Sequence, residues 1–274
     1  MRFLTMSGAG NAFVVFDARQ HPFAASPELI RAVSDPARGA GADQVFVLEP
    51  PTDPRADVFM RIWNADGQEV SACGNGARCV GWLAMRESGR DAAVIQTAER
   101  LLTARAAGPM RVTVDMGAPK LDWAEIPLAE RMDTVRIELQ VGPIDAPVLH
   151  SPGAVSVGNP HVVFFVADAE AAPVREVGPM IEHHPLFPER VNVGFAQIVA
   201  RDRIRLRVWE RGAGLTKACG TGACAALVAA VRRRLADRKA TLALDGGELE
   251  IEWRESDGHV FMTGPVSLDG EGAL

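Results

Sequence analysis

Two cysteines stand directly before similar glycine steps, Cys73-Gly-Asn-Gly and Cys219-Gly-Thr-Gly, and each step opens a segment of helical composition. The backbone N–H groups and the dipole at a helix N-terminus favour negative charge. We therefore expect the pKa values of both thiols to be lowered. The glycines would also let a ligand carboxylate approach the N–H groups. The Gly-Lys-Ser/Thr step of a P-loop is missing, which disfavours a phosphate ligand.

Two such thiols, one on each face of an α-carbon, indicate a two-base stereoinversion. One cysteine, as thiolate, removes the α-proton, and the other, as thiol, delivers a proton to the opposite face. The helix-end N–H groups stabilise the negative charge that moves onto the carboxylate in the transition state. The thiols are expected to titrate as a coupled pair, because the reaction needs one thiolate and one thiol.

A cysteine can also be a small core residue or a metal ligand. We accept the core interpretation for Cys79 and Cys224, which lie inside the expected helices. No Cys-x-x-Cys step occurs, and the six histidines form no ligand spacing beyond the adjacent His183 and His184. The sequence therefore predicts no metal site, and four cysteines are too few for a disulfide scaffold.

The elements that must position these cysteines occur twice in the chain. Residues 60–79, "MRIWNADGQEVSACGNGARC", align with residues 206–224, "LRVWERGAGLTKACGTGAC". Residues 9–16, "AGNAFVVF", align with residues 157–165, "VGNPHVVFF". The matched pairs are Asn11 and Asn159, Gln44 and Asn192, Asn64 and Glu210, and Cys73 and Cys219. The shared order and spacing predict a duplicated unit of roughly 120–150 residues.

Strand and helix compositions also recur in the two halves. Strands are expected at residues 11–16, 44–48, 57–63, 161–167, 191–199 and 203–209, which are rich in Val, Ile and Phe. Residues 75–88 and 221–235 have helical composition. The second helix is apolar on nearly all sides in its first turns, which predicts burial at the centre of its half. Ser26 and Pro27 are suitable as N-cap and first residue of a helix over 27–35.

Together these elements predict an α/β fold of two pseudosymmetric domains, rich in antiparallel strands, with the active site in the cleft between them. The boundary is expected within residues 115–123. The N-terminal half then takes residues 1–117 and is joined by a C-terminal strand, 264–274. The C-terminal half takes residues 118–263.

Composition excludes several classes of protein. Hydrophobic residues make up 47% of the chain, and the net charge of −6 gives a nucleic-acid partner no electrostatic support. The basic run 232–234 is expected to be the solvated face of a helix. The N-terminus lacks the features of a signal peptide, and the apolar runs are too short to span a bilayer. We therefore expect a soluble, cytoplasmic protein without a membrane partner.

The motifs resemble those of the diaminopimelate epimerase family, the pyridoxal-independent epimerases of lysine and peptidoglycan precursor synthesis. The segments that carry the resemblance cover nearly the whole chain: "GAGNAFVV", "NADGQEVSACGNGARC", "GNPHVVFFV", "NVGFAQ" and "ERGAGLTKACGTGACAA". The resemblance implies an isomerase that interconverts LL- and meso-2,6-diaminopimelate. It also implies two domains that each wrap a mostly antiparallel or mixed strand barrel around a central helix, a homodimer, and neither a metal nor an organic cofactor.

The resemblance further implies roles for individual residues. Cys73 and Cys219 are the acid/base pair, supported by His161 and Glu210. The remaining roles concern substrate binding: the backbone of Gly74-Asn75 and Gly220-Thr221 holds the reacting carboxylate, Asn64, Asn159, Asn192 and Arg211 hold the distal carboxylate, Glu210 takes an ammonium group, and Asn11 and Gln44 complete the pocket. The guanidinium of Arg211 is the fork-shaped partner that a carboxylate needs.

Some positions depart from the family pattern, and two other functions stay open. Ser7 and Ala12 replace the His and Asp of the family's His-Gly-x-Gly-Asn-Asp, and Gly194 replaces the Glu of Asn-Val-Glu-Phe. These changes bear on substrate range. The chain could be a racemase of the same fold for another amino acid, although a proline-racemase-like enzyme is expected to show Cys-Gly-His-Gly. It could also be a non-catalytic amino-acid-binding module, which has no need for two matched thiols.

Overall fold

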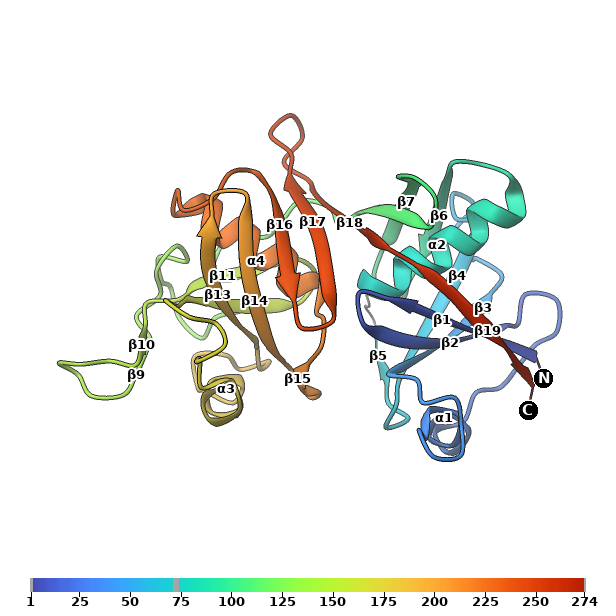
Figure 1. The fold of residues 1–274 in the computed structure, drawn as a ribbon, viewed down its shortest axis with the longest axis horizontal. Helices are drawn as coiled ribbons and strands as arrows, with labels where there is room; N and C mark the ends of the chain where they lie inside the picture. Colours follow the sequence, from blue (N-terminus) through green and yellow to red (C-terminus); the bar gives the residue numbers. More distant parts are fainter. Residues whose placement is uncertain (1, 71–73, 274) are drawn as a thin grey trace. The chain divides into compact units, whose positions relative to one another are not determined.

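The computed structural model describes residues 2–70 and 74–273, so Cys73 lies outside the described residues. The chain divides into two compact units (Figure 1). Unit 1 comprises Met1–Asp115 and Thr263–Leu274, and unit 2 comprises Met116–Met262. The first unit is therefore discontinuous in sequence, whereas the second is continuous.

Unit 1 consists mainly of strands. They are β1 (Arg2–Gly8), β2 (Asn11–Asp17), β3 (Gln44–Glu49), β4 (Val58–Asn64), β5 (Glu69–Val70), β6 (Ala92–Gln96), β7 (Leu101–Ala106), β8 (Arg111–Asp115) and β19 (Ser267–Ala273), and β18 (Val260–Pro265) crosses the boundary between the units. Strand β1 lies between β2 and β19 and is antiparallel to both. The pairs β2–β3 and β4–β6 are parallel, whereas β3–β4, β4–β5, β6–β7 and β7–β8 are antiparallel.

Helix α2 (Gly74–Ser88) packs against β1, β6, β7 and β8. Its glycines allow this close approach. A Cβ on Gly76 would lie 2.1 Å from the ring of Phe46, and a Cβ on Gly81 would lie 2.4 Å from the Cβ of Ala104. The shorter α1 (Pro27–Ser34) begins as expected, because the Oγ of its N-cap Ser26 accepts a hydrogen bond from Leu29 N at 3.3 Å.

Unit 2 repeats this plan. Its strands are β9 (Gln140–Val141), β10 (Leu149–His150), β11 (Gly153–Ser156), β12 (Pro160–Phe165), β13 (Asn192–Ala200), β14 (Arg203–Glu210), β15 (Gly214–Thr216), β16 (Lys239–Leu244) and β17 (Gly247–Trp253). The pairs β12–β13 and β14–β16 are parallel, like β2–β3 and β4–β6. The register matches too, because Phe13 lies opposite Gln44 and His161 lies opposite Asn192. The predicted pseudosymmetry is therefore confirmed.

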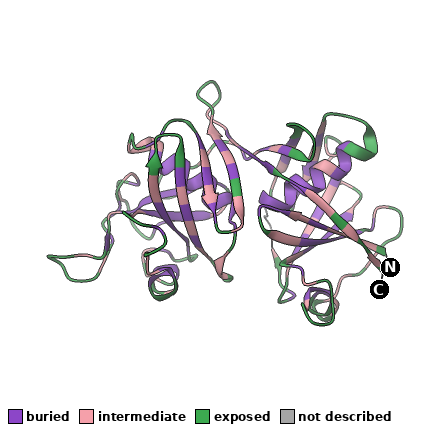
Figure 2. Ribbon diagram, viewed as in Figure 1, coloured by how far each residue is buried: buried purple, intermediate pink, exposed green. Residues whose placement is uncertain are grey.

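Helix α4 (Gly220–Arg232) forms the centre of unit 2. Every residue from Gly220 to Ala230 is buried (Figure 2). The helix contacts six strands of its own unit, namely β11, β12, β13, β14, β16 and β17. An apolar surface on all sides of a helix needs such surroundings, and the predicted central position of this helix is confirmed.

The structure also differs from the sequence prediction. Helix α3 (Val174–Glu182) and the small β9–β10 hairpin were not predicted. In the run 232–234 only Arg234 is exposed, whereas Arg232 and Arg233 are half-buried. Arg232 donates to the carbonyl oxygens of Thr134 and Ala154, and Arg233 donates to those of Val135 and Ser151. Arg232 and Arg233 satisfy backbone carbonyls around the end of α4, so the prediction was wrong for these two residues.

None of the helices in the described part of the chain has the length and apolar character that crossing a membrane requires.

Candidate active site

Cys219 is the N-cap of helix α4 and is only 3% exposed. Its Sγ accepts a hydrogen bond from Gly222 N at 3.3 Å and lies 3.6 Å from the hydroxyl of Thr221. The predicted position at the start of a helix is therefore confirmed. Because Cys219 and Gly222 are so close, a Cβ on Gly222 would lie 3.1 Å from the sulfur.

The expected lowering of the Cys219 pKa is wrong. Burial is the largest influence and raises the pKa of this thiol well above its ordinary value, and the negative charge of Glu210 acts in the same direction. The hydrogen bonds from Thr221 and from Gly222 N lower the pKa, but they do not outweigh burial. Cys219 is therefore a thiol near neutral pH.

Glu210 connects Cys219 to the β14–β15 hairpin. Its carboxylate accepts a hydrogen bond from the hydroxyl of Thr216, and its negative charge raises the pKa of the Cys219 thiol. Glu210 is the last residue of β14 and lies opposite Gly214 of β15. The turn thus fixes a carboxylate next to a buried thiol, in an arrangement that favours the protonated sulfur.

On β12, His161 belongs to a chain of hydrogen bonds that leads to the start of α4. Its Nε2 lies 3.0 Å from Asn159 Oδ1, and Asn159 Nδ2 donates to Thr221 Oγ1 at 3.3 Å. The imidazole is 1% exposed. Burial, assisted by the positive charge of Arg211, lowers the pKa of His161 to about 3. His161 is therefore a neutral hydrogen-bonding residue at neutral pH.

Arg211 is held by residues of the segment that leads into β13. Its backbone N–H donates to Asn192 Oδ1 at 2.9 Å, and its guanidinium donates to the carbonyl oxygen of Glu189 at 2.8 Å. Asn192 is anchored in turn, because its Nδ2 donates to Pro160 O at 2.9 Å. The predicted residues of unit 2 thus form two groups, one around Cys219 and one around Arg211.

The predicted residues of unit 1 are joined mainly through their amides. Asn75 Nδ2 donates to Asn11 Oδ1 at 2.7 Å, and Gln44 Nε2 donates to Asn64 Oδ1 at 2.9 Å. Gly74 is the first residue of α2, next to Asn75. The structure therefore pairs Asn11 with Asn75 and Gln44 with Asn64, at the ends of β2, β3, β4 and the start of α2.

Sequence reasoning missed three polar residues of this environment. Thr216 binds Glu210, Glu182 contacts both neighbours of the Glu210–Arg211 pair, and Arg78 donates to Asn75 Oδ1 at 3.0 Å. Arg78 is fully buried and aligns with Cys224, which is also buried. The alignment of the two halves includes Arg78 but gives no sign of its burial, and nothing in the motifs indicates Glu182.

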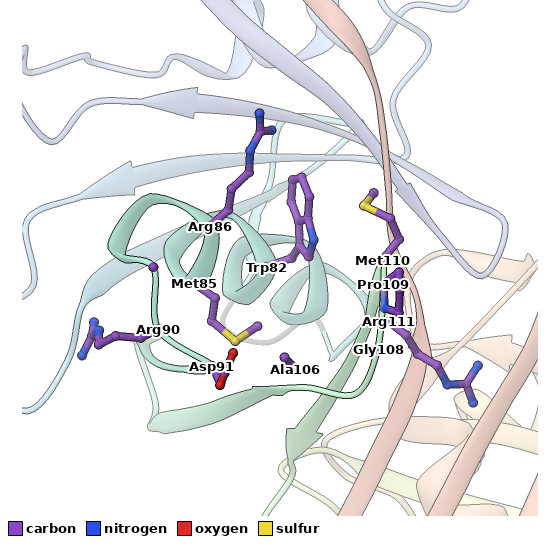
Figure 3. A pocket seen from close by; sticks show the side chains of 11 residues that line it. Trp82, Met85, Arg86, Arg90, Asp91, Ala106, Gly108, Pro109, Met110 and Arg111 are labelled. Carbon is purple, nitrogen blue, oxygen red and sulfur yellow. The ribbon is translucent and has the colours of Figure 1, made fainter.

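The pocket shown in Figure 3 lies in another part of unit 1. Helix α2 contributes Trp82, Met85 and Arg86, and the other wall includes Met110 and Arg111. The guanidinium of Arg86 lies 5.2 Å from the centre of the Trp82 ring. None of the predicted site residues lines this pocket. Among residues 2–70 and 74–273 no cluster of His, Cys, Asp or Glu could hold a metal ion.

Comparison with known proteins supplies the family. The sequence model of the family described as diaminopimelate epimerase matches residues 3–121 and 153–268. The chain belongs to this family.

Two relatives named diaminopimelate epimerase are similar over nearly their whole length. The protein of Caulobacter vibrioides is 58% identical and covers 99% of this chain and 96% of its own. The protein of Phenylobacterium zucineum is 60% identical and covers 99% of this chain and 97% of its own. Members of the family are isomerases, and so is this chain.

A solved structure supports the same fold. A predicted epimerase from Pseudomonas aeruginosa superposes with a TM-score of 0.70 at 20% identity, covering 100% of this chain and 98% of its own. The epimerase fold is thus a mixed α/β architecture, rich in strands and poor in helices, which confirms the predicted fold class.

Proposed function

We propose that the protein interconverts LL- and meso-diaminopimelate by proton transfer between two cysteines and the α-carbon, without a cofactor. The observation that carries the proposal is Cys219 at the start of α4, hydrogen-bonded by Gly222 N and adjacent to Glu210, in a chain of the epimerase family. The paired motif places Cys73 directly before α2 in the same sequence context.

In one direction of the reaction Cys219 is the acid. Burial and the Glu210 carboxylate favour the protonated form of this thiol, and the two-base mechanism then gives Cys73 the role of the thiolate that removes the α-proton. Cys219 then gives its proton to the opposite face of the α-carbon and becomes the thiolate, which Gly222 N and Thr221 stabilise. Charge is conserved, because the thiolate has passed from one cysteine to the other, and the reverse reaction follows the same steps backwards.

The reacting carboxylate is held by N–H groups at the two helix starts, those of Gly220 and Thr221 and of Gly74 and Asn75. These donors stabilise the charge that develops on the carboxylate as the proton leaves. The neutral imidazole of His161 orients Asn159 and, through it, Thr221. A protonated imidazole would add a buried positive charge, which the low pKa of His161 prevents.

The other end of the substrate carries a second carboxylate and a second ammonium group. Arg211 binds this carboxylate and Glu210 takes the ammonium, while Asn64, Asn159, Asn192, Asn11 and Gln44 donate or accept the remaining hydrogen bonds. Asn192 supports this assignment, because its Oδ1 fixes the backbone of Arg211.

The decisive experiment uses a panel of LL- and meso-diaminopimelate, proline, glutamate, lysine and histidine in deuterated water. We expect epimerisation of diaminopimelate, seen by chiral chromatography, together with solvent deuterium at its α-carbon. Turnover of another amino acid instead would assign a racemase of the same fold. Binding without exchange would assign an amino-acid-binding module.

The proposal also includes the setting of the enzyme. A role in the synthesis of lysine and peptidoglycan precursors, a homodimeric state and a cytoplasmic location are supported by the family resemblance. Sedimentation analysis of the purified protein tests the dimer, and a sedimenting mass equal to one chain of 29.3 kDa would contradict it.

A further inference from the structure

Helix α3 buries a carboxylate beside the Glu210–Arg211 pair. Glu182 is the last residue of α3 and is 3% exposed. Its Oε2 accepts a hydrogen bond from Trp209 Nε1 at 2.7 Å, and its Oε1 accepts one from Gly212 N at 2.9 Å. Arg190 lies 3.9 Å from the same carboxylate. A buried carboxylate needs partners of this kind to offset its loss of water.

The two donors stand on either side of the pair. Trp209 directly precedes Glu210, and Gly212 directly follows Arg211, so one carboxylate holds both ends of the dipeptide. Gly212 has a φ of 76°, a conformation that favours glycine. The helix also lies directly on the indole, because a Cβ on Gly178 would be 2.5 Å from Trp209 Cγ. The position of the pair is therefore set by α3.

Unit 1 offers a natural comparison. Helix α1 contributes Ile30 and Val33 to a core that includes Trp63, much as Val177 and Ile181 of α3 belong to the core against which Trp209 packs. The last residue of α1 is Ser34, which corresponds to Glu182 at the end of α3. Asn64 follows Trp63, whereas Glu210 and Arg211 follow Trp209. The buried carboxylate thus occurs in the half in which charged residues directly follow the tryptophan.

We propose that Glu182 is a positioning residue that fixes Glu210 and Arg211 at the spacing needed for the distal carboxylate and ammonium of the substrate. This inference rests on the proposed function, because it assumes that the pair binds that end of diaminopimelate. Glu182 acts through the backbone of Gly212 and the indole of Trp209, and it takes no part in the proton transfer. Its loss therefore affects substrate affinity and preference more than the chemical step.

The test measures kcat and KM for diaminopimelate and for lysine in the wild type, Glu182→Gln and Trp209→Phe. A glutamine keeps one acceptor oxygen but replaces the other with an NH2 group that faces a donor. We expect KM for diaminopimelate to rise roughly tenfold to a hundredfold in Glu182→Gln and its preference over lysine to fall. Trp209→Phe removes only one of the two hydrogen bonds and should raise KM by roughly threefold to tenfold.

Trp253→Phe is the matched control. Trp253 also donates its indole N–H within unit 2, to Gly258 O at 3.0 Å, but it has no contact with the pair. We expect this variant to keep the wild-type KM and substrate preference. It therefore shows whether loss of any indole hydrogen bond in the unit produces the same kinetic change.

The outcomes separate the inference from the function on which it rests. If Glu182 has only a structural role, Glu182→Gln lowers the melting temperature and the active fraction while KM and preference stay unchanged, and the inference is overturned. If Glu182→Gln does not fold, the KM of Trp209→Phe for diaminopimelate and its preference over lysine test the inference instead. If the wild type does not epimerise diaminopimelate, the proposed function fails and the inference fails with it.

Discussion

The two halves of the molecule share a backbone plan but differ in the chemistry of their side chains. Strand pairs β2–β3 and β12–β13 are both parallel, with Phe13 opposite Gln44 in one unit and His161 opposite Asn192 in the other. In unit 1 the predicted site residues at these strand ends are amides bonded to one another, and Arg78 and Asp43 lie beside them as partners of Asn75 and Asn11. In unit 2 the corresponding region holds ionisable groups, which include Glu210, Arg211 and the neutral His161.

This difference shows which part of a duplicated site must stay the same and which part can change. Both units keep the glycine step and the helix start, because backbone N–H groups at a helix N-terminus stabilise negative charge whatever the nearby side chains are. In the proposed function, the charged residues of unit 2 bind the distal end of the substrate, which needs one cation and one anion partner.

Replacing either motif cysteine should have the largest effect. We expect Cys219→Ala and Cys73→Ala each to lower kcat for diaminopimelate by roughly a hundredfold to ten-thousandfold, because each removes one of the two proton-transfer groups. Cys224→Ala is the control, since Cys224 is a core residue of α4 that aligns with Arg78 rather than with a motif cysteine. Near wild-type turnover in either motif variant would disprove the two-cysteine mechanism.

Arg211→Lys should weaken the binding of the distal substrate carboxylate by unit 2. The free amino acid lysine, as a substrate, lacks the distal carboxylate of diaminopimelate and would leave the Arg211 guanidinium without its partner. We therefore expect the kcat/KM of the wild type to favour diaminopimelate over lysine by about a hundredfold or more. Arg211→Lys should lose most of this preference, because an ammonium cannot make the paired contacts of a guanidinium. Arg201→Lys, an exposed arginine paired with Asp237, serves as control. Equal wild-type rates on the two amino acids would refute the assignment.

The matched glycines of the two motifs should respond differently to alanine. Gly76 faces the buried ring of Phe46 at a distance that leaves no room for a Cβ, so Gly76→Ala should lower the free energy of unfolding by about 1–3 kcal/mol. In Gly222→Ala the new Cβ would lie 3.0 Å from Val208 and 3.1 Å from the Cys219 sulfur. We expect a smaller loss of stability there and a larger loss of activity. Denaturant titration and kcat measurements of both variants check this expectation. Equal losses of unfolding free energy and of kcat in the two variants would contradict it.

His161 should make stability depend on pH in a way that Phe13 at the matched position cannot. The folded protein keeps the His161 pKa at about 3, whereas an unfolded histidine has a pKa of about 6.5. Below about pH 6.5 the unfolded chain therefore binds the extra proton, and folding stability falls as the pH falls.

The expected loss from this one residue is about 1.4 kcal/mol between neutral pH and pH 5.5. Urea titrations at several pH values between 7.5 and 5.5 give the free energy of unfolding of the wild type and of His161→Phe at each pH. The contribution of His161 is the difference between the slopes of the two plots of this free energy against pH. Parallel slopes in the two proteins would show that His161 is not kept neutral by the fold.

The sequence was sufficient to predict the main secondary-structure elements that position the candidate site. The strands β2, β3, β4, β12, β13 and β14, the helices that follow the two cysteines, and the Ser26 cap were predicted, because hydrophobic runs and capping residues act locally. The repeat also located the groups around Cys219, since Asn159 and Glu210 occupy positions related by the duplication.

The remaining features depend on packing that no local pattern records. The sign of the Cys219 pKa shift was wrong, because the effect of burial exceeds that of the helix start. Arg233 was expected in solvent, yet it binds carbonyl oxygens far away in the sequence and covers the ring of Phe165. Helix α3 contains Gly178 and Pro179, which are poor helix formers, and it forms where its apolar face packs on the core of unit 2.

The order in which the ribosome makes the chain gives the C-terminal strand β19 a further importance. Strand β1 is synthesised long before its partner β19, and the pairing runs from Arg2 opposite Ala273 to Ser7 opposite Ser267. Until β19 leaves the exit tunnel, β1 presents an open edge that could pair with another chain. Unit 2 is continuous from Met116 to Met262, so all of its residues leave the ribosome before β19 does.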